Sequence, residues 1–99
     1  EGRFGVAVLA FEHRTIAERF AGVGGIAGAA RFDGADWTTA ATGAPLLVGA
    51  LAALDCDLEE TIERHGRLLV FGRIRAVLAD PDDRRSPLLH AAGSYRNLW

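Results

Sequence analysis

The feature that most constrains this chain is a pair of strand-like runs on either side of a short turn sequence, Arg64-His65-Gly66. The first run, residues 50–63, is ambiguous, because its apolar residues fit both the spacing of a helix and the alternation of a strand. The second run, Arg67–Ala79 (RLLVFGRIRAVLA), is rich in residues that favour strands. Because Gly66 can adopt the left-handed conformation of a three-residue hairpin loop, the two runs together favour a β-hairpin over a helix.

The predicted hairpin pairs Ala52–Ile62 antiparallel with Leu68–Leu78. In this register two acidic residues each face an arginine, which specifies the pairing although an exposed charge pair contributes little energy. The expected pairs are Asp57 with Arg73 and Asp55 with Arg75. Because side chains alternate between the two faces of a strand, we expect one inward and one outward set. These are Leu54, Cys56, Leu58, Ile74 and Ala76 inward, and Asp55, Asp57, Arg73 and Arg75 outward.

The N-terminal third predicts another strand, a short helix and a loop. Phe4–Ala10 (FGVAVLA) is a short apolar run of the kind that forms a buried strand. Thr15 and Glu18 have the spacing of a capping box, which predicts a helix over Thr15–Ala21. Gly22–Asp36 is rich in Gly and Ala, so we expect a loop there.

The C-terminal twenty residues predict a polar loop followed by a second short helix. Asp80–Arg85 (DPDDRR) is the loop. Ser86-Pro87 is a favourable helix start, with Ser as the cap and Pro in the first turn, and Gly93 ends the helix after residues 88–92.

Composition and charge exclude several classes of protein. Ninety-nine residues suffice for one small domain. The 13 acidic and 11 basic residues give a net charge of −2, so we expect neither nucleic acid nor an anionic membrane as a partner. The single cysteine, Cys56, excludes an internal disulfide and suits a reducing cytoplasm. Because the chain begins at Glu1 and contains no Met, we expect either that a natural start has been removed or that the front of the protein lies outside these residues.

Several candidate sites have simpler interpretations. Gly22, Gly24 and Ala27 match a dinucleotide fingerprint, but no strand precedes them, so a plain loop is favoured. Acidic residues between positions 55 and 63 could suggest a cation site, yet a solvated strand face explains them better. The three histidines lack paired-ligand spacing, and we expect no metal site. His65 is the one histidine at a predicted turn, where it is either an exposed turn residue or a ligand contact.

A set of short motifs occurs in a fixed order along nearly the whole chain. They are Phe4-x-Val6-x-Val8-Leu9, Phe20-Ala21, Arg31-Phe32, Trp37, Thr42-Gly43-Ala44-Pro45-Leu46-Leu47, Gly49-Ala50-Leu51-Ala52, Leu54-Asp55-Cys56, Gly72, Pro87-Leu88-Leu89 and Gly93-x-Tyr95-Arg96. In this order they resemble the C-terminal portion of the flavin reductase-like family, whose fold is an FMN-binding split barrel.

The resemblance implies a mainly β fold, an antiparallel split β-barrel of Greek-key type with short helices. It also implies that residues 1–99 are the C-terminal part of a single domain, with the first strands and much of the flavin-binding surface upstream of Glu1. Family members are typically homodimeric enzymes in which NADH or NADPH reduces FMN or FAD, often for a partner monooxygenase. We therefore expect an NAD(P)H:flavin oxidoreductase. Two alternatives stay open: a flavin-binding module without reductase activity, and a dimerising structural element.

The resemblance also suggests site residues, while no catalytic residue can be named. The expected flavin contacts are Val8, Leu9, Phe32 and Tyr95. The family often has a His five residues before the strand glycine, near the nicotinamide. Arg67 occupies that position here, with His65 two residues earlier, so either could contact the pyridine nucleotide. The family often has Asn where this chain has Ala7, which removes one polar flavin contact.

Overall fold

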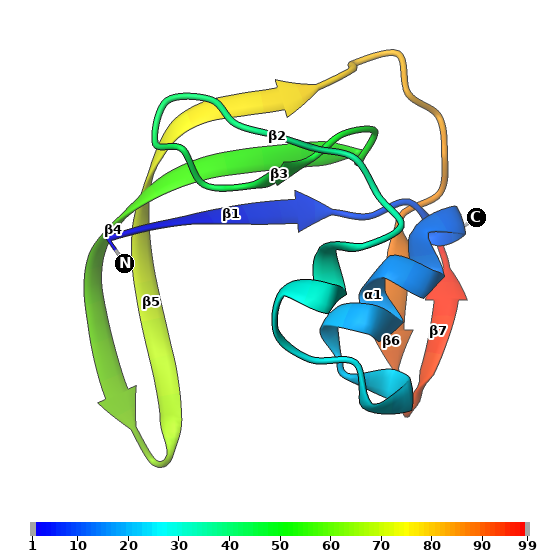
Figure 1. The fold of residues 1–99 in the computed structure, drawn as a ribbon, viewed down its shortest axis with the longest axis horizontal. Helices are drawn as coiled ribbons and strands as arrows, with labels where there is room; N and C mark the ends of the chain where they lie inside the picture. The colour runs from blue at the N-terminus through cyan, green and yellow to red at the C-terminus, as the bar shows by residue number, and fades with distance from the viewer. Residues whose placement is uncertain (1, 99) are drawn as a thin grey trace.

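The computed structural model describes residues 2–98, and the chain is mainly β with antiparallel strands (Figure 1). The main sheet has the strand order β1-β4-β5, with β1 (Arg3–Val8), β4 (Ala52–Arg64) and β5 (Arg67–Ala79). Two smaller sheets pair β2 (Trp37–Thr38) with β3 (Leu46–Leu47) and β6 (Leu88–Ala91) with β7 (Ser94–Asn97). The helical elements are η1 (Phe11–His13), α1 (Arg14–Phe20), η2 (Val23–Gly25) and η3 (Gly28–Phe32).

The predicted hairpin is confirmed, and its turn is shorter than expected. β4 and β5 pair along their whole length, and Arg64 lies directly opposite Arg67. The loop therefore contains only His65 and Gly66, with φ values of 53° and 75°. Two successive left-handed residues are typical of the turn whose twist matches that of the flanking strands. The three-residue loop predicted from the sequence is corrected to two residues.

The predicted register holds only over residues 56–58 of β4, between two register shifts, and is wrong by one residue on either side of them. Asp57 lies opposite Arg73, as predicted. The register then shifts between Asp55 and Cys56, so Asp55 lies opposite Ala76 and not opposite Arg75. A bulge adds one residue to a single strand and changes which side chains share a face. The extra residue is Arg75, whose Nη1 donates to the Asp57 carboxylate at 2.6 Å. Beyond the second shift, between Leu58 and Glu60, Ile62 lies opposite Leu69 and not opposite Leu68.

The predicted inward and outward sets are therefore only partly right. Cys56 is buried as predicted, and burial raises the pKa of its thiol. Asp55, predicted outward, is fully buried, whereas Leu58 and Ile74, predicted inward, are exposed. The reason is that the chain after the Thr42–Pro45 turn covers the face of the sheet that carries Asp55. No second layer covers the opposite face among residues 2–98.

The core is small and lies where β3 and the preceding turn pack on β1 and β4. Its buried apolar residues are Ala10, Ala44, Leu46, Leu47, Ala53 and Cys56. Gly5 allows this close approach, because a Cβ at this position would lie 2.6 Å from the Pro45 carbonyl oxygen. β1 was predicted as a buried strand; the strand is confirmed, but as an edge strand it is largely exposed.

The first helix is confirmed, with a different start. α1 begins at Arg14 and ends at Phe20, and its N-cap, His13, makes no side-chain capping bond. The predicted capping box between Thr15 and Glu18 is therefore wrong. The preceding turn η1 leads the chain into the helix one residue early, so Thr15 already lies within it. Glu18 instead pairs with Arg14 one turn back, at 3.5 Å.

The predicted C-terminal helix is wrong, because residues 88–91 form strand β6. β6 turns back through Ala92 and Gly93, both left-handed, and pairs with β7. The chain just before β6 is also bound to the chain after β1. Ala10 bridges Pro87, and the Leu88 N–H donates to the Leu9 carbonyl at 2.8 Å. Pairing with a distant segment overrides the local helix signal of Ser86-Pro87.

The outer strand β5 exposes apolar side chains on both of its faces. Leu68 and Ile74 are 61% and 55% exposed, and Leu69, Val70, Phe71 and Val77 are also exposed. The far end of the β4–β5 hairpin extends beyond β1 and away from α1 (Figure 1). Within residues 2–98, no helix is long and apolar enough to cross a membrane.

Candidate functional site: an aromatic pocket

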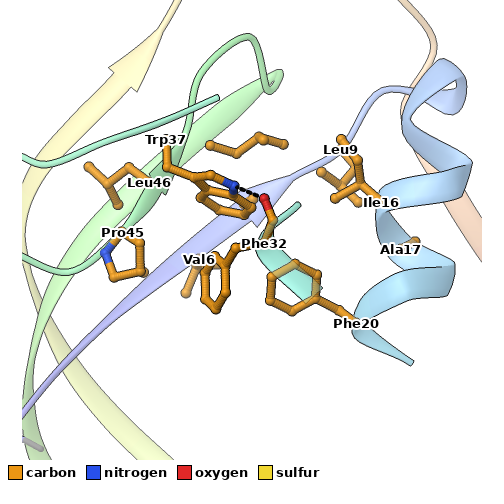
Figure 2. A pocket seen from close by; sticks show the side chains of 12 residues that line it. Val6, Leu9, Ile16, Ala17, Phe20, Phe32, Trp37, Pro45 and Leu46 are labelled. Atoms are coloured by element: carbon orange, nitrogen blue, oxygen red, sulfur yellow. Dashed lines mark hydrogen bonds between the residues drawn. The ribbon is translucent and has the colours of Figure 1, made fainter. Parts of the chain in front are cut away.

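A pocket of about 290 Å³ opens between β1, α1, η3 and β3 (Figure 2). We call it the aromatic pocket. Its principal lining residues are Val6, Leu9, Phe20, Phe32, Trp37 and Leu46. No charged side chain among residues 2–98 lines it. Its size is near the lower end of the roughly 300–1,000 Å³ typical of ligand sites, so it suits a flat ring system and not a whole nucleotide.

Three aromatic side chains from separate elements form one side of the aromatic pocket. The Phe32 ring packs edge-on against Trp37 at 4.9 Å between centroids and against Phe20 at 5.1 Å. The Trp37 Nε1–H donates to the Phe32 carbonyl oxygen at 2.9 Å, which fixes the indole relative to η3 (Figure 2). Edge-to-face contacts of this kind stabilise the cluster beyond simple area burial. The rings are therefore held in place without a ligand.

The surrounding elements explain how the chain places these rings. Trp37 lies in β2 directly opposite Leu47 of β3, so the small hairpin orients the indole. Leu9 follows the last residue of β1, and Phe20 is the last residue of α1. Ala7 also lines the pocket, where the family often has Asn, so this wall is apolar here.

Positive charge lies beside the aromatic pocket, next to Phe20. The Arg31 guanidinium carbon is 5.5 Å from the Phe20 ring centroid, within the range of a cation–π contact. Arg31 Nε donates to the Gly28 carbonyl oxygen at 3.0 Å. Arg19 Nη2 donates to the Ala30 carbonyl oxygen at 2.7 Å and so ties α1 to η3.

The structure brings together two of the four expected flavin contacts. Leu9 and Phe32 both line the aromatic pocket. Val8 lies at the end of β1, is 43% exposed and does not line the pocket. Tyr95 lies in β7, packed against His90 at 4.9 Å between ring centroids, with the Arg14 guanidinium carbon 5.6 Å from its ring.

The two expected nicotinamide residues lie elsewhere. His65 is in the β4–β5 turn and Arg67 begins β5, at the end of the hairpin that projects away from α1 (Figure 1). Neither lines the aromatic pocket. Their role in binding nicotinamide stays a prediction.

Sequence reasoning did not assign Phe20 and Trp37 to the site. Both residues belonged to the motifs of the resemblance, but nothing local shows that the two face each other. Their centroids are 5.7 Å apart although 17 positions separate them in the chain. The sequence signal that could have identified them is the set of aromatic residues before, within and after the glycine-rich loop, namely Phe20, Phe32 and Trp37. The folded chain brings these residues together.

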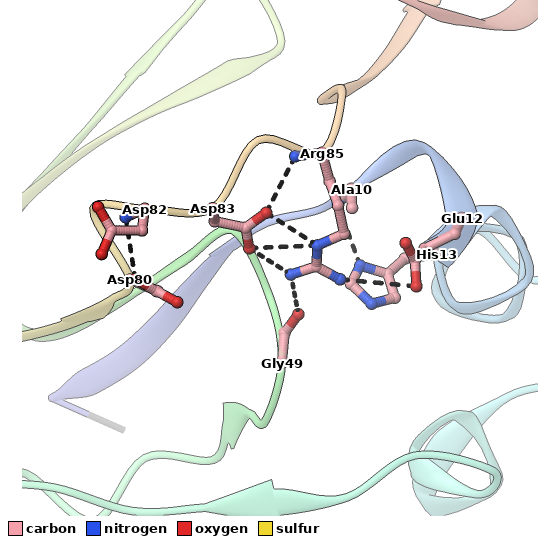
Figure 3. Close-up of polar contacts among 8 residues, drawn as sticks. All are labelled: Ala10, Glu12, His13, Gly49, Asp80, Asp82, Asp83 and Arg85. Atoms are coloured by element: carbon pink, nitrogen blue, oxygen red, sulfur yellow. Dashed lines mark hydrogen bonds and ion pairs between the residues drawn. The ribbon is translucent and has the colours of Figure 1, made fainter.

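A polar cluster around Arg85 joins the loop before β6 to the segment after β3 and to the turn η1 (Figure 3). Its guanidinium forms a hydrogen-bonded ion pair with Asp83 at 2.6 Å, and Nη2 also donates to the Gly49 carbonyl oxygen at 2.8 Å. Glu12 lies within ion-pair distance at 3.6 Å. The hydrogen bond from Arg85 lowers the pKa of Asp83 to about 2. Because every strong donor of Arg85 has a protein partner, this cluster is structural.

The aromatic pocket fits the ring portion of a flavin. An isoalloxazine is a flat aromatic system, and Phe32, Trp37 and Leu9 offer apolar and aromatic surface to it. The pocket offers nothing to a phosphate, because no cation lines it. The residues therefore fit the flavin ring inside the pocket and the phosphate outside it.

Comparison with known proteins agrees with the fold. The model of a family described as flavin reductase like domain matches residues 1–98. The reductase subunit HsaB of a flavin-dependent monooxygenase from Rhodococcus jostii is 35% identical over 97 residues, which cover 98% of this chain and 47% of HsaB. This chain spans about half the length of the curated relatives that match nearly all of it.

Two solved structures share the fold. Nitrilotriacetate monooxygenase component B from Mycobacterium thermoresistibile has a TM-score of 0.85 and 28% identity, covering 99% of this chain and 52% of that one. The NADH:FAD oxidoreductase SgcE6 of Streptomyces globisporus, solved with NAD and FAD fragments, has a TM-score of 0.77 and 28% identity, covering 93% and 53%. The expected antiparallel split-barrel fold is thereby confirmed. This chain belongs to the flavin reductase-like domain family.

Proposed function

We propose that this chain is part of an NAD(P)H-dependent flavin reductase that supplies reduced flavin to a partner monooxygenase. The observation that carries the proposal is the aromatic pocket, an apolar site of ring size in a chain of the flavin reductase-like family. Relatives whose names describe reductase subunits of monooxygenases support the partner. A relative solved with NAD and FAD fragments supports the two cofactor classes.

In this proposal the flavin supplies the redox chemistry and the protein supplies binding and orientation. Phe32 and Trp37 contact the flavin ring, and their mutual packing keeps the site formed when it is empty. Leu9 and Ile16 exclude water from the opposite side. Val8 and Tyr95 lie outside the aromatic pocket, so they contact flavin only where parts of a complete or dimeric protein bring them to it.

Steady-state kinetics on the full-length protein tests the proposed function. We expect oxidation of NADH or NADPH that depends on added FMN or FAD. The loss of reduced-nicotinamide absorbance measures this oxidation. Flavin binding without nucleotide oxidation would instead support the non-catalytic flavin-binding module. A protein that neither binds nor reduces flavin would contradict both.

One specific observation favours a second function, that of an association surface. β5 is an edge strand with unpaired backbone groups and apolar side chains on both faces. Such an edge favours pairing with another chain. We therefore expect the isolated 99-residue chain to self-associate and to bind flavin poorly. A monomer in analytical ultracentrifugation, with flavin affinity in the micromolar range, would contradict this expectation.

A further inference from the structure

The aromatic pocket accommodates a ring but has no group that could bind a phosphate. FMN and FAD carry a phosphate or pyrophosphate beyond the ring and its ribityl chain. A buried or half-buried phosphate needs a charged donor, and arginine provides one with paired N–H groups. The nearest candidates are the two arginines beside Phe20, namely Arg19 and Arg31.

Of the two, Arg31 has hydrogen-bond donors that no acceptor among residues 2–98 occupies. Within this part of the chain only its Nε has a protein acceptor, the Gly28 carbonyl oxygen, so both terminal nitrogens are available to a ligand there. No carboxylate pairs with Arg31 among residues 2–98, where the ion pairs involve other arginines. The acidic residue nearest in sequence, Asp33, makes no ion pair with it and follows η3 with its backbone N–H bonded to Ala30.

Arg19 is placed for a different role. Its Nη2 is bonded to the Ala30 carbonyl oxygen, and its Nε is buried without a partner. A guanidinium held in this way links α1 to η3 and fixes the segment that carries Arg31. Arg19 is therefore a positioning residue, and of the two it is Arg31 that keeps terminal donors without a partner among residues 2–98.

Arg31 is half-buried, so part of its side chain is accessible to a ligand. A Cβ built on Gly28, whose carbonyl holds the Arg31 Nε, meets no atom within 4 Å. On its other side, the guanidinium lies against the Phe20 ring, which lines the aromatic pocket. A molecule with a ring in the pocket could therefore place an anionic tail at Arg31.

We propose that Arg31 binds the phosphate of the flavin nucleotide, and so makes the site selective for FMN or FAD over riboflavin. This inference rests on the proposed flavin reductase function and names the part of the ligand that this residue recognises. The terminal nitrogens of Arg31 donate to phosphate oxygens while Nε keeps the side chain bonded to the loop. Because the contact is charge-assisted, it weakens as salt concentration rises.

The test compares FMN with riboflavin, which has the same ring and no phosphate, by flavin-fluorescence titration of the full-length protein. We expect FMN to bind at least about tenfold more tightly than riboflavin. Arg31→Gln should weaken FMN binding by about tenfold and leave riboflavin binding unchanged, and Arg31→Lys should restore part of the loss. Arg84→Gln is the matched control, since the only partner of Arg84 among residues 2–98 is the Pro81 carbonyl oxygen and Arg84 does not line the aromatic pocket, so neither affinity should change.

Each outcome decides the inference. Equal weakening of FMN and riboflavin in Arg31→Gln would show that Arg31 only supports Phe20, and would overturn the phosphate role. Equal affinity of the wild type for both ligands would overturn it too, while the proposed reductase function stands. Failure of the wild type to bind either ligand would overturn both. Inorganic pyrophosphate gives a second readout that needs no flavin ring: it should compete with FMN in the wild type and not in Arg31→Gln.

Discussion

Asp55 holds the Thr42 turn on the sheet. One carboxylate oxygen accepts a hydrogen bond from the Thr42 backbone N–H at 2.9 Å, and the other accepts one from the Thr42 hydroxyl. Asp55 is 0% exposed, and the hydrogen bond from the Thr42 side chain is the main reason that its pKa is lowered. The turn leads directly into Pro45 and Leu46, which line the aromatic pocket. A buried carboxylate thus helps to shape a pocket that it does not touch.

We predict that Asp55→Asn destabilises the chain, because an amide supplies only one acceptor to the two donors of Thr42 and places its own NH₂ group against one of them. A loss of about 1 kcal/mol in the free energy of unfolding lowers the Tm of a domain of this size by about 4–8 °C. Thermal unfolding followed by circular dichroism measures this fall. Asp57→Asn is the matched control, because Asp57 pairs with Arg75 at the surface, where ion pairs contribute little. A Tm change for Asp55→Asn no larger than that of the control would contradict the role of Asp55.

Gly5→Ala should be destabilising because it forces β1 away from the turn. The new Cβ would lie 2.6 Å from the Pro45 carbonyl oxygen and 3.0 Å from the Leu46 Cδ2. Overpacking of this kind typically costs about 1–3 kcal/mol, which chemical denaturation can resolve. Gly2→Ala is the control, because a Cβ there meets no atom within 4 Å. Equal stability of the two variants would show that the Pro45 contact is not tight.

Acid should destabilise the chain through two groups of the Arg85 cluster. The pKa of Asp83 falls from 3.8 to about 2 in the folded state, so its contribution to stability is complete above pH 3.8 and is lost as the pH falls through 2. Burial, and then the charge of Arg85, lower the pKa of His13 below 6.5. His13 is therefore protonated more easily in the unfolded chain, and its contribution is lost as the pH falls below 6.5.

Urea unfolding between pH 7 and pH 2 measures this effect. We expect the midpoint to fall in two ranges, one below pH 6.5 from His13 and one between pH 3.8 and 2 that includes Asp83. Asp83→Asn should reduce the second fall. Because the charge of Asp83 raises the pKa of His13, its removal should lower that pKa further and deepen the first fall. A midpoint that stays constant from pH 7 to pH 5 would contradict the role given to His13.

The hairpin was predictable from the sequence, whereas its two register shifts were not. Alternation and the turn glycine specify that β4 pairs with β5, and the predicted pairing of Asp57 with Arg73 is confirmed. The shift beside Asp55 has no local signal, because it depends on the Thr42 turn packing on that face. In the sequence Asp55 stands among alternating charged residues, a pattern typical of a solvent-exposed strand face. Its burial is possible only because the folded chain brings the Thr42 donors to it.

The candidate site was predictable in part. Leu9 and Phe32 were expected from the resemblance, and both line the aromatic pocket. Phe20 and Trp37 were not assigned to the site, since they come together only through α1, η3 and the β2–β3 hairpin. The helix predicted after Ser86 failed for the same reason, because backbone pairing with Leu9 and Ala10 decides the conformation there.

The proposed nucleotide role of Arg67 has a kinetic signature. Arg67 makes no ion pair with Glu63 or any other acid among residues 2–98, so its charge is available. In the full-length protein, Arg67→Ala should raise KM for NAD(P)H about tenfold, roughly 1.4 kcal/mol, with kcat nearly unchanged. Arg64→Ala, across the turn, is the control. An effect of Arg67→Ala on Tm alone, with both kinetic constants unchanged, would refute the nucleotide role.

The central claim is that the aromatic pocket binds the flavin ring, and a riboflavin titration of the full-length protein tests it most directly. Riboflavin removes the phosphate from the comparison, so only contacts to the ring and ribityl chain are measured. We predict that Phe32→Ala weakens riboflavin binding about tenfold, because it removes one aromatic wall. Phe71→Ala, on the exposed strand β5, should leave the Kd unchanged. An unchanged Kd in Phe32→Ala, with the protein folded, would contradict the assignment of this pocket to flavin.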